Sequence, residues 1–276
     1  MESEQSTKGQ RESRKDDWES FWDEKQDTDE VYSNAGRVLR HLSKVTSLEG
    51  KKVLEIGAGT GRDSFPLVEH GAIVYQLDYA ENSLRILKRL AEDSNLPVSI
   101  VGGDTFRLPF RDATFDVVFH QGLLEHFRKP VATQLLRENI RILKPKGLLL
   151  VDVPQRWHSY TVAKHILIAV DKWFAGWERS FSIGELRAVL RSLGLTPLYA
   201  YGEWMYPSFF YRAFREVLKK VDVTLPLYPT LGKPLTNLRT SVRARLLSTP
   251  LPLYTGISIG VVACKSDESL ERPQHT

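Results

Sequence analysis

A glycine-rich loop flanked by acidic residues is the part of this sequence best suited to binding a ligand. The loop Gly57-Ala58-Gly59-Thr60-Gly61 follows an apolar segment that contains Glu55 and precedes Asp63. Because glycine lacks a Cβ atom, the backbone can turn sharply there and approach a ligand closely. Carboxylates on both sides of the loop would repel a pyrophosphate but attract a cationic amino-acid group. We therefore expect a nucleotide-type cofactor whose positively charged end meets this loop.

Polar side chains suited to the rest of a nucleotide follow later β-type segments. Residues 73–77 form a largely apolar run that ends at Asp78-Tyr79. A carboxylate at this position can accept both ribose hydroxyls, but nicotinamide dinucleotide enzymes place one similarly, so Asp78 alone does not discriminate. Asp104-Thr105 and Gln121 follow two further strand-like segments. All these residues fall at the carboxyl ends of predicted strands, where open α/β sheets bind ligands.

Taken in order, these segments resemble the motifs of the class I S-adenosylmethionine (SAM) dependent methyltransferases. The loop spacing is Gly-x-Gly-x-Gly, unlike the Gly-x-Gly-x-x-Gly of dinucleotide enzymes. The resemblance spans about a hundred residues and implies SAM as the cofactor. In that family the residue matching Asp104 holds the adenine amino group, and the next backbone N–H meets a ring nitrogen. The implied cofactor residues are Glu55, Gly57, Gly59, Gly61, Asp78, Tyr79, Asp104, Thr105 and Gln121.

The elements that must position these residues alternate between strands and helices. From 51 to 153 this alternation predicts an α/β fold with a doubly wound, mostly parallel sheet. The family resemblance implies seven strands, with an antiparallel last strand between the fifth and sixth. Helical additions should cover the ligand face. The predicted organisation is a polar tail (1–17), a helical segment (18–50), the methyltransferase domain (51–264) with additions at 155–181 and 204–256, and a flexible tail (265–276).

Local patterns predict individual helices within this organisation. One helix should run from the glycine loop to Gly71, and another over about 81–93. Ser182 and Glu185 have the spacing of a capping box that opens a helix ending at Gly194. Before the sheet, an amphipathic helix is expected from the spacing of Val31, Ala35, Val38, Leu39 and Leu42.

Three histidines are candidate bases for a methyl transfer. The sulfonium already activates the methyl group, so the protein must mainly position the acceptor and, where needed, remove its proton. His126 follows Glu125 in a stretch where many small-molecule members of the family carry Glu-His near the methyl donor. His126 could instead pack against or cap a helix. His158 could instead lie in a solvent-exposed loop with no part in catalysis. His120 is the third candidate, and no spacing matches a metal site.

Aromatic residues are concentrated outside the predicted core. All six tryptophans lie outside residues 51–153. A core of Val, Leu and Ile needs no tryptophan, whereas large flat rings suit the walls of a ligand pocket. We expect at least one of Trp157, Trp173 and Trp177 to line the pocket, although any single ring could instead only seal an addition onto the core.

Composition limits the class of protein and its surroundings. The hydrophobic share is 42% and the charged share 26%, as in ordinary globular proteins. A single cysteine, Cys264, excludes an intramolecular disulfide within this chain. The polar start shows no secretory pattern, and no run of 18 apolar residues is present, so a cytoplasmic location is expected.

Positive charge is concentrated in residues 204–256. This segment carries eight basic and two acidic residues, a net charge of +6, although the whole chain is only +4. A helix beginning near Pro207 would carry an apolar stripe that includes Phe210 and Phe214 beside a basic stripe that includes Arg212 and Arg215. Such a helix suits peripheral contact with a membrane. A lid packed on the protein's own core is the alternative.

The sequence narrows the substrate class. His120-Gln121-Gly122 stands where DNA methyltransferases of this fold carry Asn/Asp-Pro-Pro-Tyr/Phe or Pro-Cys, so DNA is excluded. RNA is disfavoured because no RNA-binding module is visible, despite a sequence pI of about 9.0. We expect a small, lipid-like or aromatic acceptor that is methylated on oxygen or carbon. A NAD(P)-dependent oxidoreductase and a catalytically silent SAM-binding protein remain as alternatives.

Overall fold

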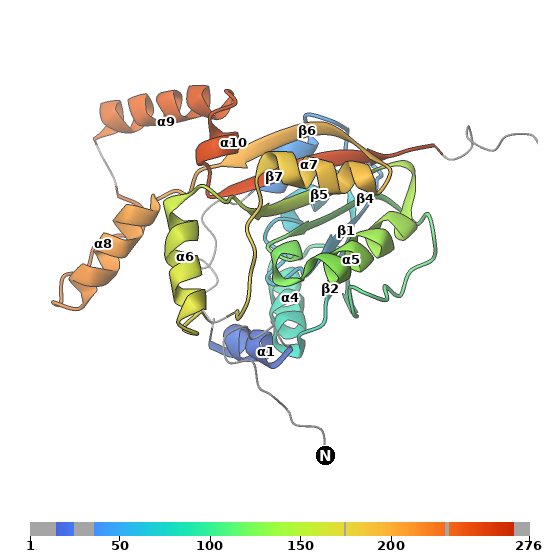
Figure 1. Cartoon of the computed structure of the whole chain (residues 1–276), viewed down its shortest axis with the longest axis horizontal. Coiled ribbons are helices and arrows are strands. Elements are labelled where there is room, and N and C mark those ends of the chain that lie inside the picture. The colour runs from blue at the N-terminus through green and yellow to red at the C-terminus, as the bar shows by residue number, and fades with distance from the viewer. Residues whose placement is uncertain (1–14, 25–35, 174, 230–231, 268–276) are drawn as a thin grey trace, which may run out of the picture.

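The computed structural model describes residues 15–24, 36–173, 175–229 and 232–267. Its centre is a seven-stranded sheet in the order β3-β2-β1-β4-β5-β7-β6 (Figure 1). Neighbouring strands from β3 to β5 pair in parallel, whereas β7 is antiparallel to both β5 and β6. The strands are β1 Lys52–Ile56, β2 Ile73–Asp78, β3 Val98–Gly102, β4 Phe115–Gln121, β5 Leu143–Pro154, β6 Leu195–Glu203 and β7 Ser258–Lys265. The predicted fold and the place of the last strand are confirmed.

Helices lie on both faces of the sheet and in the two additions (Figure 1). Those that precede the sheet or connect its strands are α1 Lys15–Glu24, α2 Arg37–Leu42, α3 Phe65–Val68, α4 Glu81–Asp93, α5 Lys129–Ile142 and α7 Ile183–Ser192. The additions contain α6 Ser159–Ala169, α8 Phe209–Lys219, α9 Lys233–Leu247 and α10 Pro252–Thr255. A 3-10 turn, η2 Leu124–His126, follows β4.

Two apolar layers enclose the sheet because successive side chains along a strand point to opposite faces. Val53, Val117 and Leu150 are buried in one layer. Leu54 and Val118, their neighbours along β1 and β4, are buried in the other layer. The sheet is therefore covered on both sides, as the near-continuous apolar strands predict.

Most predicted elements are present, with two differences in extent. Helix α4 spans Glu81–Asp93, and the capping box joins Ser182 to Glu185 in both directions. Helix α1 begins at Lys15, inside the stretch predicted as tail, and Trp22 is buried from it. The helix predicted to run from the glycine loop to Gly71 is shorter, because the chain makes turns at 62–64 before α3 begins. Val31 and Ala35 lie outside the described residues.

The two additions differ in how they meet the sheet. Helix α6 stands beside the sheet, whereas α8 and α9 extend away from it (Figure 1). No residue of α8 or α9 is buried. The apolar stripe of α8 therefore does not pack against the core as a lid.

Candidate active site

The glycine loop adopts a backbone that other residues rarely take. Gly57, Gly59 and Gly61 have φ values of 67°, 57° and 65°. A Cβ atom on Gly61 would also lie 2.2 Å from the Gln76 side chain. The loop is tied to the end of β2, because the Gly59 N–H donates to Asp78 at 2.9 Å. The alternating glycines thus let β1 turn tightly around the end of β2.

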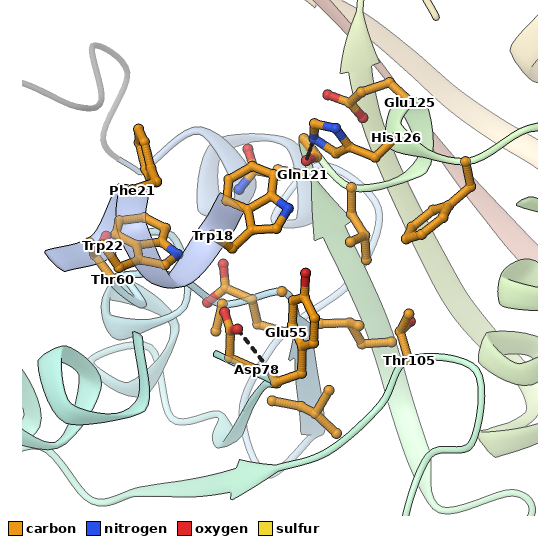
Figure 2. Close-up of a pocket in the computed structure, with 18 of the residues that line it drawn as sticks. Trp18, Phe21, Trp22, Glu55, Thr60, Asp78, Thr105, Gln121, Glu125 and His126 are labelled. Carbon is orange, nitrogen blue, oxygen red and sulfur yellow. Dashed lines mark hydrogen bonds between the residues drawn. The ribbon is translucent and has the colours of Figure 1, made fainter. Parts of the chain in front are cut away.

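A cavity of about 690 Å³ opens above this loop. Glu55 and Asp78 lie toward one end of it, and Glu125 and His126 toward the other (Figure 2). Of the predicted cofactor residues, seven line the cavity: Glu55, Gly57, Asp78, Tyr79, Asp104, Thr105 and Gln121. Gly59 and Gly61 do not line it, and they act through the shape of the loop. The structure thus brings the ends of β1, β2 and β4 to one site.

The lower part of the cavity is acidic. Glu55, Asp63 and Asp78 are all buried there. Burial, and then the neighbouring Asp63, raise the pKa of Glu55 well above its usual range. Burial also raises the pKa of Asp78, although backbone N–H groups of Gly59, Tyr79 and Ala80 oppose this. A cation in this position would lower both pKa values and favour the charged carboxylates.

Several polar atoms around the cavity are buried without a hydrogen-bond partner among the described residues. They are Glu55 Oε2, Asp63 Oδ1, Thr105 Oγ1, Gln121 Oε1 and Arg37 Nε. Buried polar groups are normally satisfied, so a set of unsatisfied atoms in residues that line one cavity indicates a polar ligand. Their chemistry suits SAM: carboxylates for an ammonium group, amide and hydroxyl groups for a nucleoside, and a guanidinium for a carboxylate. Sequence reasoning missed Arg37, which reaches the cavity from α2.

His126 stands at the opposite end of the cavity with one ring nitrogen engaged. Its Nε2 lies 3.0 Å from the carbonyl oxygen of Gly122, so this nitrogen carries the proton and donates it. Nδ1 is then unprotonated, and it has no hydrogen-bond partner in the described part of the chain. Burial lowers the pKa of His126, while Glu178 at 3.8 Å from Nδ1 acts in the opposite direction. The ring is therefore neutral near pH 7, with a free lone pair beside a carboxylate.

Glu178 is held by a buried network that the sequence did not reveal. Lys164 Nζ lies 2.7 Å from its Oε2, and Trp173 Nε1 donates to its Oε1 at 2.6 Å. Burial alone would raise the pKa of Glu178, but His126 when it is protonated, the Lys164 ammonium, and the hydrogen bonds from Lys164 and Trp173 lower it below its usual value. Glu125 lies in the same region, and burial followed by Glu178 raises its pKa. These residues come from separate segments, so only the fold brings them together.

Aromatic rings line the remaining wall. Trp18, Phe21 and Trp22 of α1 lie on one side of the cavity (Figure 2). The Trp18 ring meets His126 edge-on, with ring centroids 5.0 Å apart. Trp173 also lines the cavity, which confirms the expectation for the first addition. The sequence analysis did not predict that Trp18 and Trp22 line the cavity. Their separation of four residues, which places them on one face of a helix, was the signal that could have indicated it.

Other predicted residues lie away from the cavity. His158 is the N-cap of α6, where its Nδ1 accepts a hydrogen bond from the backbone of Tyr160, and it is not among the lining residues. His120 is fully buried within β4, and burial lowers its pKa to about 3. Trp157 is exposed, and Trp177 packs against the guanidinium of Arg128. Among the candidate histidines, the structure brings His126 alone to the cavity.

Comparisons with known proteins agree with this geometry. Residues 54–151 match the family model described as a methyltransferase domain. A ubiquinone biosynthesis O-methyltransferase of Ruegeria pomeroyi is 31% identical over 169 residues, which cover 59% of this chain and 67% of that protein. The chain belongs to the class I SAM-dependent methyltransferases. S-adenosylmethionine is accordingly its cofactor, and methyl transfer is its reaction.

Further members of the family resemble it over shorter stretches or in fold alone. A demethylmenaquinone methyltransferase of Renibacterium salmoninarum is 34% identical over 110 residues, covering 40% of this chain and 44% of that protein. The Burkholderia thailandensis 1,6-didemethyltoxoflavin N1-methyltransferase, solved with S-adenosylhomocysteine, superposes with a TM-score of 0.58 at 18% identity. That match covers 92% of this chain and 87% of the other, and it shows the shared fold.

Proposed function

We propose that this methyltransferase transfers the SAM methyl group to an oxygen or carbon of a small, lipid-like or aromatic acceptor. One observation carries the proposal: a single cavity joins an acidic, nucleoside-fitting end to an aromatic end with an unprotonated His126 Nδ1. Relatives named for ubiquinone and menaquinone methylation support an acceptor of quinone type.

The cofactor end of the proposal assigns a role to each polar group. Glu55 and Asp63 would hold the ammonium group of SAM, and Arg37 its carboxylate. Asp78 would accept the ribose hydroxyls, and Asp104 with Thr105 would bind the adenine. The other predicted cofactor residues that line the cavity, Gly57, Tyr79 and Gln121, would shape the path between these groups. When bound, SAM supplies a methyl group already activated by its sulfonium.

The acceptor end of the proposal assigns His126 as the base. The acceptor ring would lie among Trp18, Phe106 and Trp173, which fix its orientation in line with the methyl group. His126 Nδ1 would take the acceptor's proton, and Glu178 would stabilise the imidazolium that results. Lys164 and Trp173 hold Glu178 in place, so it is a positioning residue for His126. The proposal leaves His158 with its capping role alone.

Calorimetry tests the cofactor half of the proposal. Asp78→Asn should weaken SAM binding at least about tenfold, since hydrogen bonds to a charged group each contribute about 1.5–3 kcal/mol. Glu138→Gln is the matched control, because Glu138 pairs with Arg141 outside the cavity. Equal SAM affinity in Asp78→Asn and Glu138→Gln would overturn this assignment of Asp78.

Mass spectrometry tests the acceptor half. The protein is incubated with isotopically labelled SAM and either hydroxylated aromatic compounds with isoprenoid chains or demethylated quinones. A labelled methyl group on such a compound supports the proposal, and its position separates oxygen from carbon methylation. SAM binding without transfer to any member of either set, or to a lipid extract, would overturn the proposed acceptor class.

A further inference from the structure

Helix α6 has its apolar side facing outward. Lys164, only 1% exposed, and Tyr160 line the cavity. Val162 and Ile166 are 59% and 60% exposed. Residues two positions apart are separated by about 200° around the helix axis. Val162 and Ile166 are each two positions from Lys164, so they lie on the opposite face of α6. A helix that buries a lysine and exposes its aliphatic residues is the reverse of an ordinary surface helix.

The second addition exposes the same kind of surface. On α8, Phe210 and Phe214 are 69% and 55% exposed, and they recur at the spacing of one helix face. Leu235 and Leu238 are similarly exposed on α9. Of the large apolar side chains exposed in the described residues, all but four belong to residues 157–170 or 210–254. The four others are Ile73, Tyr79, Val131 and Leu198.

Positive charge accompanies these apolar faces. Residues 204–256 carry a net charge of +6, so the rest of the chain has a net charge of −2. Lys220 at the end of α8 and Arg245 in α9 are both exposed. Long basic side chains can lay their stems along apolar groups while their charged ends reach outward. The charge asymmetry would also orient the whole molecule toward a negatively charged surface.

We propose that the outward faces of α6, α8 and α9, termed here the docking surface, bind peripherally to an anionic lipid bilayer. No helix of the described chain is long and apolar enough to cross a membrane. In this contact, apolar side chains would enter the lipid–water boundary and basic residues would meet lipid phosphates. Trp157, 69% exposed just before α6, has the ring type enriched at that boundary.

A bilayer fits this surface better than a second copy of the chain. The centre of a protein interface is depleted of charged residues, and lysine is uncommon there. Here basic residues are interspersed with the apolar stripes of α8 and α9. A self-complementary contact between two copies would also bring two segments of +6 together, which is unfavourable.

Helices α6 and α8, which carry part of the docking surface, also meet beside the cavity. Tyr160 lines the cavity from α6, and its ring meets Phe209 of α8 edge-on at 5.7 Å. On this proposal, an acceptor leaving the bilayer would pass α6 to reach the cavity. This route rests on the proposed function, whereas the membrane contact itself does not.

Co-sedimentation with vesicles tests the contact. The full chain is mixed, without SAM or acceptor, with vesicles of phosphatidylcholine and phosphatidylglycerol or of phosphatidylcholine alone, at low and high salt. Binding should require phosphatidylglycerol and weaken at high salt. Ile166→Glu and Phe214→Glu should each weaken binding severalfold, and Lys220→Gln and Arg245→Gln about fivefold each, as expected near an anionic leaflet.

Val131→Glu is the matched control, because Val131 is an exposed apolar residue on α5, outside the docking surface. Circular dichroism would establish that each variant is folded.

Fluorescence quenching gives a second measurement on the unaltered chain. Brominated lipid tails should quench the fluorescence of Trp157, and Trp157→Phe should remove that quenching. No binding at low salt would overturn the proposal. So would binding unaffected by Ile166→Glu and Phe214→Glu, or gel filtration showing dimers that these variants dissociate. Since no acceptor is present, such failure would leave the proposed reaction standing.

Discussion

At the scale of single residues, His126 can serve both roles considered from the sequence, as a general base and as a packing residue. Its Nε2 donates to the Gly122 carbonyl, which fixes the ring against the turn after β4. Its Nδ1 remains free toward the cavity, near the carboxylate of Glu178. Packing and proton transfer are therefore compatible, because each uses a different nitrogen.

We expect His126→Ala to lower kcat by about 10²–10⁴-fold, the usual contribution of a general base. SAM affinity, measured by calorimetry, should change little, because Asp78 and Glu55 lie at the other end of the cavity. His70→Ala is the control, since that histidine is exposed and bonds only the backbone of Pro66 in the contacts described. Undiminished activity in His126→Ala would assign the residue a packing role alone.

The pH profile gives a separate test of the same residue. Activity requires unprotonated Nδ1, and burial lowers the pKa of His126 below its ordinary value of 6.5. The acid limb of kcat/KM should therefore fall below pH 6.5. Glu178→Gln should move that limb to still lower pH, because the carboxylate raises the pKa of His126, and should also lower kcat. An acid limb unchanged by Glu178→Gln would separate Glu178 from His126.

At the scale of elements, α1 is held against α4 because Glu19 of α1 caps the N-terminus of α4. Ala80, the N-cap of α4, provides no side-chain hydrogen bond. Instead the Glu19 carboxylate accepts from the backbone N–H groups of Glu81 and Asn82 at 2.7 and 3.0 Å. A negative charge at a helix N-terminus is also favoured by the helix dipole. The same helix places Trp18 and Trp22 on the cavity wall.

We expect Glu19→Ala to release α1 from α4. Loss of a helix cap lowers the free energy of unfolding by about 0.5–2 kcal/mol. Thermal unfolding should show this loss, and calorimetry should show weaker SAM binding, because the wall formed by Trp18 and Trp22 would be less fixed. Asp23→Ala changes an exposed acidic residue near the other end of α1 and is the control. Equal SAM affinity in the two variants would show that α1 does not contribute to the cofactor site.

At the scale of the whole molecule, distant parts of the chain are joined at the edge of the sheet through the buried carboxylate of Glu203. Glu203 at the end of β6 accepts from Arg40 at 2.8 Å and lies 2.9 Å from His41 Nε2, both of α2. Burial would raise the pKa of Glu203, but these partners lower it to about 2. Since Arg37 of α2 lines the cavity, this pairing also fixes one wall of the site.

Because the folded pKa of Glu203 lies below its unfolded value of 4.5, its stabilisation is full above pH 4.5 and is lost as pH falls toward 2. Glu203→Gln should lower the free energy of unfolding at pH 7 by about 3 kcal/mol and reduce its decline over that acid range. Urea unfolding at several pH values measures both effects. Parallel curves for the variant and the unaltered protein between pH 4.5 and 2 would contradict this role of Glu203.

The sequence by itself determined the sheet, the glycine loop and the acidic residues that line the cavity beside that loop. These depend on local patterns: apolar runs that must be buried, glycines at alternate positions, and acidic residues at strand ends. Only the tertiary structure decided the acceptor end. Lys164, Glu178 and Trp173 are far from His126 along the chain and follow no spacing rule, because the additions that carry them fold against the cavity. The direction of α6 was likewise a tertiary result, since an amphipathic pattern does not reveal which face of a helix is turned inward.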